Sequence, residues 1–219
     1  GYHAKVIKYQ GSDGKFYAIK KLRGEKEVKH FNSNPLAQFN TEVEVYKKLE
    51  DIPYVPRLYE INSAPEIIEN NSLVISWVDG KPSSKRGTFY DFDLLSTNNI
   101  NRIFEAMLDF DKRGVLHGDL WAANILMTED KVNIIDFNRS VIKNPEEINE
   151  INANRDNSNI ANFKYRFLNR FLSDVYDRKG EDELLIAYEN CLKCEKKYYQ
   201  NKSDLFRKSS FMYPEKRKE

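Results

Sequence analysis

Hydrophobic and polar residues alternate along the first part of the chain in the manner of β-strands. The alternation runs through Ala4–Arg23 on both sides of the turn-forming segment Gly11–Gly14, which predicts a β-hairpin. Two later apolar runs, Val55–Ile61 and Ser72–Val78, are bounded by polar residues and predict two further strands. The segment Asp79–Pro82 has the residue types of a turn and would close this part of the chain.

The remaining periodicity is helical. Apolar residues recur at spacings of three and four in Ala37–Asp51, after a charged loop over residues 24–36. A second such run, Ile100–Arg113, is followed by Gly114, a residue type that commonly ends helices. Two further helices are predicted over Ile160–Tyr176 and Glu181–Tyr199.

The order of these elements predicts an α+β protein of two lobes. Residues 1–80 would form an N-terminal lobe of four or five strands and one helix, and residues 81–219 a helical C-terminal lobe. The length of 219 residues and the hydrophobic fraction of 40% allow one sizeable core or two small lobes that share a cleft. Charged residues make up 32% of the chain and nearly balance, with a net charge of +1, so we expect no nucleic-acid partner. No apolar run approaches about 18 residues, so we expect no membrane span.

Two cysteines, Cys191 and Cys194, form a Cys-x-x-Cys pattern. A zinc site needs about four ligands, and the histidines lie in segments that do not supply a second ligand pair. The cysteines also fall within a predicted helix, so we expect neither a zinc site nor a redox site. The scarcity of cysteine is typical of a reducing compartment, which predicts a cytoplasmic location.

One segment carries a dense set of polar residues at characteristic spacing. It reads His117-Gly118-Asp119, then Asn124 five positions after the aspartate, then Asp136 after two short apolar strands. This spacing resembles the catalytic half of protein kinases, in which the first aspartate receives the proton of the substrate hydroxyl and the asparagine and second aspartate hold Mg²⁺. The parts that hold ATP should then lie upstream.

The predicted hairpin carries a matching pattern. Gly1, Ala4 and Val6 match the trailing half of a glycine-rich loop, G-x-x-G-x-V, with alanine in place of the last glycine. Small residues at a hairpin tip let backbone amides approach triphosphate oxygens. Ala18 and Lys20 follow in an Ala-Ile-Lys run, and a lysine on the neighbouring strand would neutralise charge on the α- and β-phosphates.

Lys20 needs a carboxylate to fix its ammonium group, and the first predicted helix offers Glu42 and Glu44. These two side chains would point about 200° apart on a helix, so only one of them can face the cleft. The kinase pattern E-x-x-x-L-x-x-L favours Glu42, because Tyr46 and Leu49 would then pack on the lobe.

These ordered motifs identify the chain as similar to the protein kinase-like superfamily over roughly residues 1–175. The resemblance implies a bilobal kinase fold, with Asp119 as the catalytic base and Lys20 paired with Glu42 as the phosphate anchor. It also implies ATP as the nucleotide. The residues implied to bind it are Gly1, Ala4, Val6, Ala18, Lys20, Ile75, and the backbone of Ser76 and Val78.

The resemblance further implies that Asn124 and Asp136 hold Mg²⁺, for which Mn²⁺ can substitute, and that His117 supports the catalytic loop. Two departures from the family pattern matter. Gly118 replaces the arginine that reads a phosphorylated activation loop, so control by that phosphorylation is not expected. Asn138 replaces the glycine of the D-F-G motif.

The segment after these motifs is short. No A-P-E sequence follows at the expected place, and only twenty residues separate Asp136 from Asp156. Arg155 and Asp156 would open the next helix and support the catalytic loop. We therefore expect a reduced C-lobe that lacks a full activation segment, and a partner protein is one way to complete its surface.

Three functions fit these motifs. The first is a minimal protein serine/threonine kinase acting on a protein substrate, similar to effector kinases that bacterial pathogens inject into the host cytosol, with RIO-like kinases also similar. The second is a small-molecule or glycan kinase, because Asp136-Phe-Asn-Arg followed by serine resembles the I-D-F-D-R run of lipopolysaccharide sugar kinases. The third is a pseudokinase that binds a partner through the same fold. It ranks last because all the charged groups that the reaction needs are present.

Overall fold

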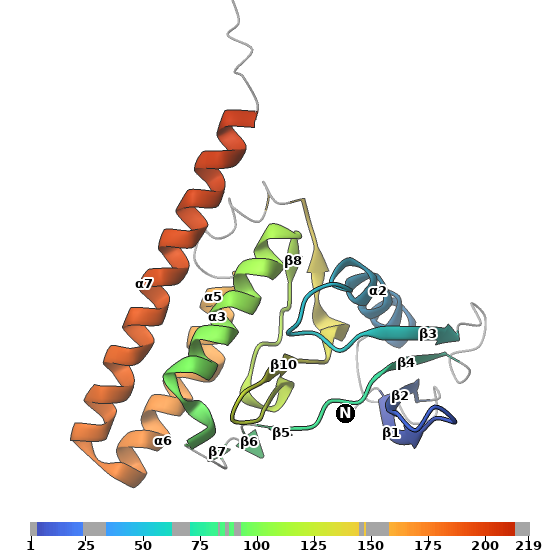
Figure 1. Ribbon diagram of the computed structural model, residues 1–219, viewed down its shortest axis with the longest axis horizontal. Coiled ribbons are helices and arrows are strands. Elements are labelled where there is room, and N and C mark those ends of the chain that lie inside the picture. Colours follow the sequence, from blue (N-terminus) through green and yellow to red (C-terminus); the bar gives the residue numbers. More distant parts are fainter. Residues whose placement is uncertain are drawn as a thin grey trace, which may run out of the picture.

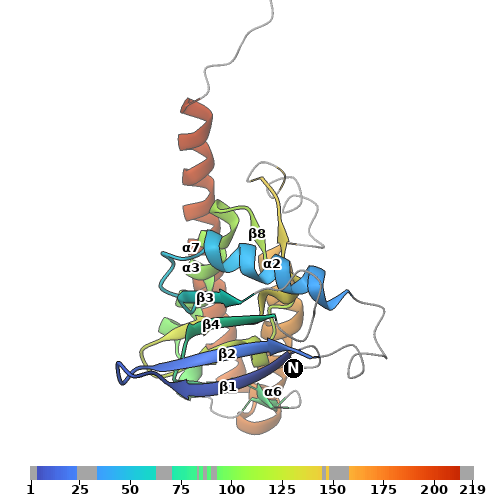
Figure 2. The ribbon, with the colours of Figure 1, turned by 90° about the vertical axis from the view of Figure 1, so that its right-hand side faces the viewer.

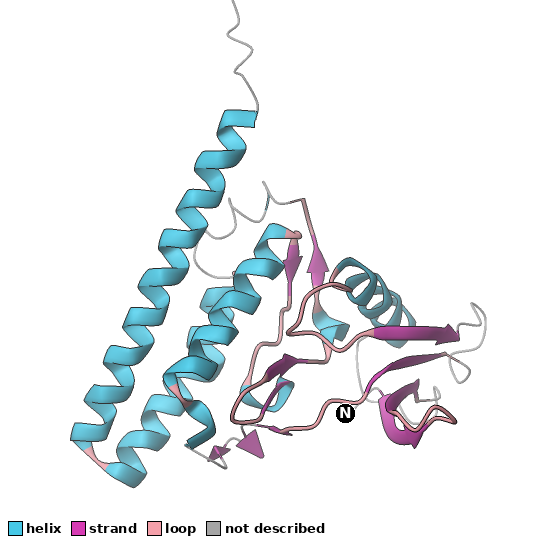
Figure 3. Cartoon of the chain, viewed as in Figure 1, coloured by secondary structure: helices cyan, strands magenta, loops and turns pink. Residues whose placement is uncertain are grey.

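The computed structural model describes residues 4–23, 34–62, 71–82, 84–85, 88–89, 93–144, 147 and 158–212. The larger strands lie on one side of the molecule and the longest helices on the other (Figures 1 and 3). This arrangement confirms the mixed α+β class. Among the described residues, no helix combines the length and the apolar content that crossing a bilayer requires.

Four antiparallel strands form the N-terminal sheet: β1 (Ala4–Gln10), β2 (Phe16–Leu22), β3 (Leu58–Asn62) and β4 (Ser72–Ser76). Their order in the sheet is β1-β2-β4-β3. The predicted hairpin is confirmed, with Gly14 at a φ of 78° in its turn. Strand β3 begins later than predicted, after Pro56, which has no N–H to donate to the ladder.

Helix α2 (Pro35–Lys48) lies beside this sheet (Figure 2). It begins two residues before the predicted start because Asn34 Oδ1 accepts a hydrogen bond from the backbone N–H of Ala37 at 3.1 Å, and Pro35 suits the first helical position. Its inner face buries Phe39 and Tyr46.

The chain leaves the sheet in an extended conformation and joins a second sheet, in the order β10-β9-β5. The strands are β5 (Lys81–Pro82), β9 (Ile125–Met127) and β10 (Val132–Ile134). The turn predicted at Asp79–Pro82 is therefore wrong. A Cβ on Gly80 would lie 3.2 Å from the backbone nitrogen of Met127, so this glycine serves the close approach to β9 rather than a chain reversal.

The C-terminal part is mainly helical. Its helices are α3 (Thr97–Lys112), α5 (Asn159–Phe163), α6 (Asn169–Lys179) and α7 (Glu181–Met212), with a π-helical turn, η5 (Lys164–Leu168), between α5 and α6. The short elements are β6 (Ser84–Lys85), β7 (Thr88–Phe89), η2 (Asp93–Leu95), β8 (Val115–Leu116), η3 (Ala122–Asn124), η4 (Phe137–Arg139) and β11 (Val141–Ile142). Helix α3 begins three residues before its predicted start because Ser96 Oγ caps it.

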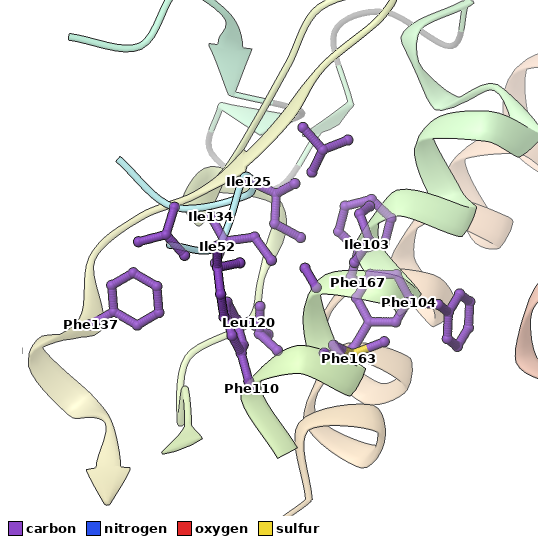
Figure 4. Packing of buried hydrophobic residues seen from close by; sticks show 14 of the residues in the cluster. Ile52, Ile103, Phe104, Phe110, Leu120, Ile125, Ile134, Phe137, Phe163 and Phe167 are labelled. Carbon is purple, nitrogen blue, oxygen red and sulfur yellow. The ribbon is translucent and has the colours of Figure 1, made fainter. Parts of the chain in front are cut away.

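The hydrophobic core joins these helices to the loop that carries the predicted catalytic residues (Figure 4). Phe163 packs edge-on against Phe104 of α3 and stacks on Phe167 of η5, with ring centroids 5.5 and 4.8 Å apart. Leu120 and Ile125 extend the core beneath the loop, and both are fully buried. The loop is thus anchored by apolar packing on its inner side.

A buried polar cluster ties α7 to α3 and α5. Asp111 Oδ1 accepts from Asn159 Nδ2 at 2.8 Å, while its Oδ2 accepts from the Tyr198 hydroxyl at 2.5 Å and from Lys202 Nζ at 2.6 Å. These contacts require α7 to continue past the predicted end at Tyr199, since Lys202 lies one turn beyond Tyr198.

Replacing Asp111 with alanine should lower the free energy of unfolding by about 3–5 kcal/mol, because the Lys202 ammonium would stay buried without its carboxylate. Urea unfolding followed by circular dichroism measures this. Asp109→Ala is the matched control: Asp109 lies on the same helix, pairs with Lys112 at the surface and should cost less than about 1 kcal/mol. Equal losses in the two variants would contradict the role of the buried cluster.

Candidate active site

Lys20 joins three elements that are far apart in the sequence. Its Nζ on β2 lies 2.8 Å from Glu42 Oε1 of α2 and 2.5 Å from Asp136 Oδ1, which precedes η4. The side chains of Lys20 and Glu42 are 12% and 2% exposed. Glu44 points to solvent, so the structure brings Glu42 rather than Glu44 to the lysine.

Lys20 and Asp136 stabilise each other's charged forms inside the protein. Burial alone would lower the pKa of Lys20, but the carboxylates of Glu42 and Asp136 outweigh it and raise that pKa. Burial would likewise raise the pKa of Asp136, and the attraction of Lys20 outweighs it, so the pKa is lowered. For Glu42, burial together with the charge of Asp136 prevails over Lys20 and raises the pKa. Lys20 and Asp136 are therefore held in their charged forms.

The backbone of Asp136 is held in an unusual conformation. Its φ of 68° makes it the sole residue other than glycine with a positive φ in the described part of the chain. The next residue, Phe137, is fully buried and packs edge-on against Tyr46 and Phe110. Backbone strain of this kind persists only where packing enforces it, and it concentrates at functional sites.

The residues predicted to hold the nucleotide share one face of the N-terminal sheet. Val6, Lys20 and Leu73 lie opposite one another on β1, β2 and β4, and Ala18 is paired with Ile75 in a neighbouring row. Ala18 and Ile75 are buried, whereas Val6 is 54% exposed.

Further residues of the predicted nucleotide site lie at the ends of the strands. The N–H of Ser76 donates to the carbonyl of Arg57 at 2.8 Å, so the Ser76 group suited to a base is its carbonyl oxygen. Val78 follows in the extended segment toward β5, and Ala4 is buried at the start of β1. Gly1 lies outside the described residues.

Asn124 is oriented by the aspartate five residues before it. Its Nδ2 donates to the Asp119 backbone carbonyl at 3.0 Å and to Asp119 Oδ2 at 3.3 Å, which leaves the Asn124 amide oxygen for a cation. Mg²⁺ prefers oxygen ligands and usually takes one or two from the protein, with the rest from water and substrate phosphates. An amide oxygen of Asn124 and a carboxylate of Asp136 fit this donor set.

His117 is fully buried at the start of the predicted catalytic loop, residues 117–124. Its Nδ1 accepts from the Asp119 N–H at 3.3 Å, and its Nε2 lies 3.0 Å from the Ile135 carbonyl. Both contacts are satisfied at once only if Nε2 carries the hydrogen, so the ring is neutral. Burial lowers the pKa of His117 to about 4. The His117 ring therefore links the predicted catalytic loop to Ile135, which follows β10 and precedes Asp136.

Protonation of His117 should make the fold sensitive to acid. Unfolding returns its pKa to about 6.5, so the unfolded chain binds more protons below that pH. The contribution of His117 is full above about pH 6.5 and falls toward pH 4, with a loss of about 2 kcal/mol at pH 5. Urea unfolding of the wild type and of His117→Gln at pH 7 and pH 5 measures this difference. The same pH dependence in both proteins would contradict the assignment.

Gly118 has a structural role that the sequence comparison missed. Its φ is 76°, and a Cβ at this position would overlap the carbonyl oxygen of Arg139. From the sequence, Gly118 indicates only the loss of a regulatory arginine. The structure adds that no side chain fits between the catalytic loop and η4.

The predicted catalytic loop is supported by residues that sequence reasoning did not name. Arg155 and Asp156, predicted for this role, lie outside the described residues. Among the described residues, Asn159 Oδ1 accepts from the His117 N–H at 2.9 Å and Asn162 Oδ1 accepts from the Leu120 N–H at 2.8 Å. The signal in the sequence was the Asn-x-x-Asn spacing at a helix start, which places both amides on one face.

Arg166 is a further residue that sequence reasoning missed. Its guanidinium Nη1 lies 2.6 Å from Asp119 Oδ1, and the side chains are 41% and 16% exposed. The kinase motifs matched by this sequence do not include position 166, and the two residues are 47 positions apart.

The site therefore combines a buried lysine–carboxylate cluster, a loop aspartate next to an asparagine, and a sheet face suited to a nucleotide. The sequence matches the family model of the protein kinase domain over residues 1–160 of the 219-residue chain. Members of this family are ATP-dependent phosphotransferases. With the geometry and this match in agreement over most of its length, the chain belongs to the protein kinase domain family.

Proposed function

We propose that this protein is an active kinase that transfers the γ-phosphoryl group of ATP to a hydroxyl, and that its acceptor is a serine or threonine of a protein. The observation that carries the proposal is the position of Lys20 Nζ, 2.8 Å from Glu42 and 2.5 Å from Asp136. In kinases the lysine–glutamate pair and the metal-binding aspartate must both be in place for catalysis.

Each residue has a distinct task in this proposal. Lys20 would donate to the α- and β-phosphates while Glu42 keeps its ammonium in position. Asp119 would accept the proton of the acceptor hydroxyl as that oxygen attacks the γ-phosphorus. When bound, Mg²⁺ would neutralise charge on the phosphates, with Asn124 and Asp136 as its protein ligands.

A small-molecule or glycan acceptor is the second candidate. The run Asp136-Phe137-Asn138-Arg139 resembles the corresponding run of lipopolysaccharide sugar kinases, and its last three residues form η4, which lies against Gly118. A pseudokinase is the remaining alternative, and it differs from both because it would transfer no phosphate.

Incubation with γ-labelled ATP, Mg²⁺ and a cell lysate separates the three functions, with Asp119→Asn protein as the parallel control. Label in a discrete protein band that depends on Asp119 supports a protein kinase. Label only in small molecules or glycans supports the second candidate. Absence of transferred label in every fraction would sink the proposal of an active kinase.

A further inference from the structure

Arg166 lies at the predicted catalytic base but has no role in the mechanism above. Its Nη1 is 2.6 Å from Asp119 Oδ1, and it is the more exposed side chain of the pair. An exposed ion pair contributes only about 0–1 kcal/mol to folding. Stability alone is thus a weak reason for a cation at this position.

The helix that carries Arg166 is fixed to the catalytic loop. Asn159, Asn162 and Arg166 follow one another at spacings of three and four, and all three contact the segment from His117 to Leu120. The two asparagines each accept a backbone N–H of that segment. Arg166 is therefore presented to the base by a helix whose position relative to the loop is already set.

The turn that bears Arg166 is itself unusual. The N–H of Asn169 bonds to the carbonyl of Lys164, an i to i+5 contact that makes this turn a π-helix. Phe163, which precedes the turn, and Phe167 within it are both fully buried and hold the turn against the core. Isolated π-turns cost stability and occur frequently at functional sites.

We propose that Arg166 is a catalytic residue that contacts both Asp119 and the phosphoryl group in transfer. In the reaction the acceptor oxygen forms a bond to the γ-phosphorus, the bond from phosphorus to the β,γ-bridging oxygen breaks, the hydroxyl proton passes to Asp119, and ADP leaves. The acceptor oxygen lies within hydrogen-bond reach of the base, so the phosphoryl oxygens are also near it. A guanidinium has five donors in a planar fork, which lets it keep Asp119 and bond a phosphoryl oxygen as well.

This inference rests on the proposed function. Because the natural acceptor is unidentified, the test uses water as the acceptor of the phosphoryl group. The reaction measured is the slow release of labelled phosphate from γ-labelled ATP in the presence of Mg²⁺. Arg166→Met should lower this rate by about 10²- to 10³-fold, as loss of a donor to transition-state charge does elsewhere, with little change in KM for ATP. Arg166→Lys should retain more of the rate than Arg166→Met, because lysine keeps the positive charge but lacks the planar guanidinium with its several donors.

Arg170→Met is the matched control, since Arg170 lies one turn further along the same helix and pairs with Asp174 at 3.4 Å. A second readout is binding, by calorimetry, of MgADP alone and of MgADP with aluminium fluoride, a planar mimic of the phosphoryl group. Arg166→Met should bind MgADP like the wild type and lose the added affinity that aluminium fluoride confers. Arg170→Met should keep that added affinity.

The outcomes separate the inference from the proposed function. If Arg166→Met matches Arg170→Met in both readouts while Asp119→Asn is inactive, Arg166 is not catalytic and the proposed function stands. If the wild type neither binds MgADP nor releases phosphate faster than Asp119→Asn, the proposed function fails and the inference falls with it. If Arg166→Met unfolds at a lower temperature than Arg170→Met, the same two readouts are compared for Arg166→Lys instead.

Discussion

Replacing Asp119 with asparagine is expected to lower phosphoryl transfer by about 10²- to 10⁴-fold while the affinity for MgATP stays within a few fold. The reason is that a base acts on the acceptor hydroxyl, which it affects mainly in the transition state. In the structure the Asp119 carboxylate contacts Arg166 and Asn124, and asparagine keeps its size and shape.

Two measurements check this expectation: the rate of label transfer from γ-labelled ATP, and calorimetric titration with MgATP. Asp130→Asn serves as the control, because Asp130 is an exposed aspartate after β9 that bonds only locally to Thr128 Oγ1 at 2.9 Å in the described contacts. Wild-type turnover by Asp119→Asn would remove Asp119 from the role of base. A large loss of MgATP affinity would instead point to a role in nucleotide binding.

Replacing Asp136 with asparagine is expected to abolish activity and to remove the Mg²⁺-dependent part of nucleotide binding, because the cation would lose its charged protein ligand. Asparagine is the most informative substitution at position 136. It tolerates the left-handed backbone, with a φ of 68°, far better than alanine, so a loss of function is not due to backbone strain. Lys20 keeps its partner Glu42 in this variant.

Thermal unfolding measures the effect as the shift in Tm with ATP alone and with ATP plus Mg²⁺. The Tm of the wild type should rise more with ATP plus Mg²⁺ than with ATP alone, because a ligand that binds the folded state stabilises it. Asp136→Asn should show the same shift in both conditions, and the Asp130→Asn control should behave like the wild type. If Mg²⁺ adds as much stabilisation to Asp136→Asn as to the wild type, Asp136 is not the metal ligand.

Much of this organisation follows from local patterns in the sequence. Alternating apolar residues around Gly11–Gly14 predict the hairpin, and helical spacing predicts the run that becomes α3. The choice of Glu42 over Glu44 needed helix geometry, because residues two apart on a helix cannot face the same side, together with the kinase pattern E-x-x-x-L-x-x-L. These inferences succeed since each depends on residues within one element and its neighbours.

Other features were decided by contacts between distant parts of the chain. The end of the expected turn at Asp79–Pro82 became strand β5 because β9 pairs with it from a distant part of the sequence, Lys81 with Met127 and Pro82 with Leu126. Helix α7 runs past Tyr199 because Lys202 reaches a buried carboxylate on α3. Propensity near a helix end is weak, so tertiary contacts set where the helix stops.

By itself, the sequence of this protein determined which residue types are present in kinase order: a strand lysine, a helix glutamate, and the aspartates and asparagine of the catalytic segment. Only the tertiary structure decided that Lys20 bridges Glu42 and Asp136, that Gly118 leaves no room for a side chain, and that Arg166 meets Asp119. The physical reason is that spacing along the chain controls which side chains share a face of one element. Which faces then meet depends on how the elements pack, and that packing is a property of the whole core.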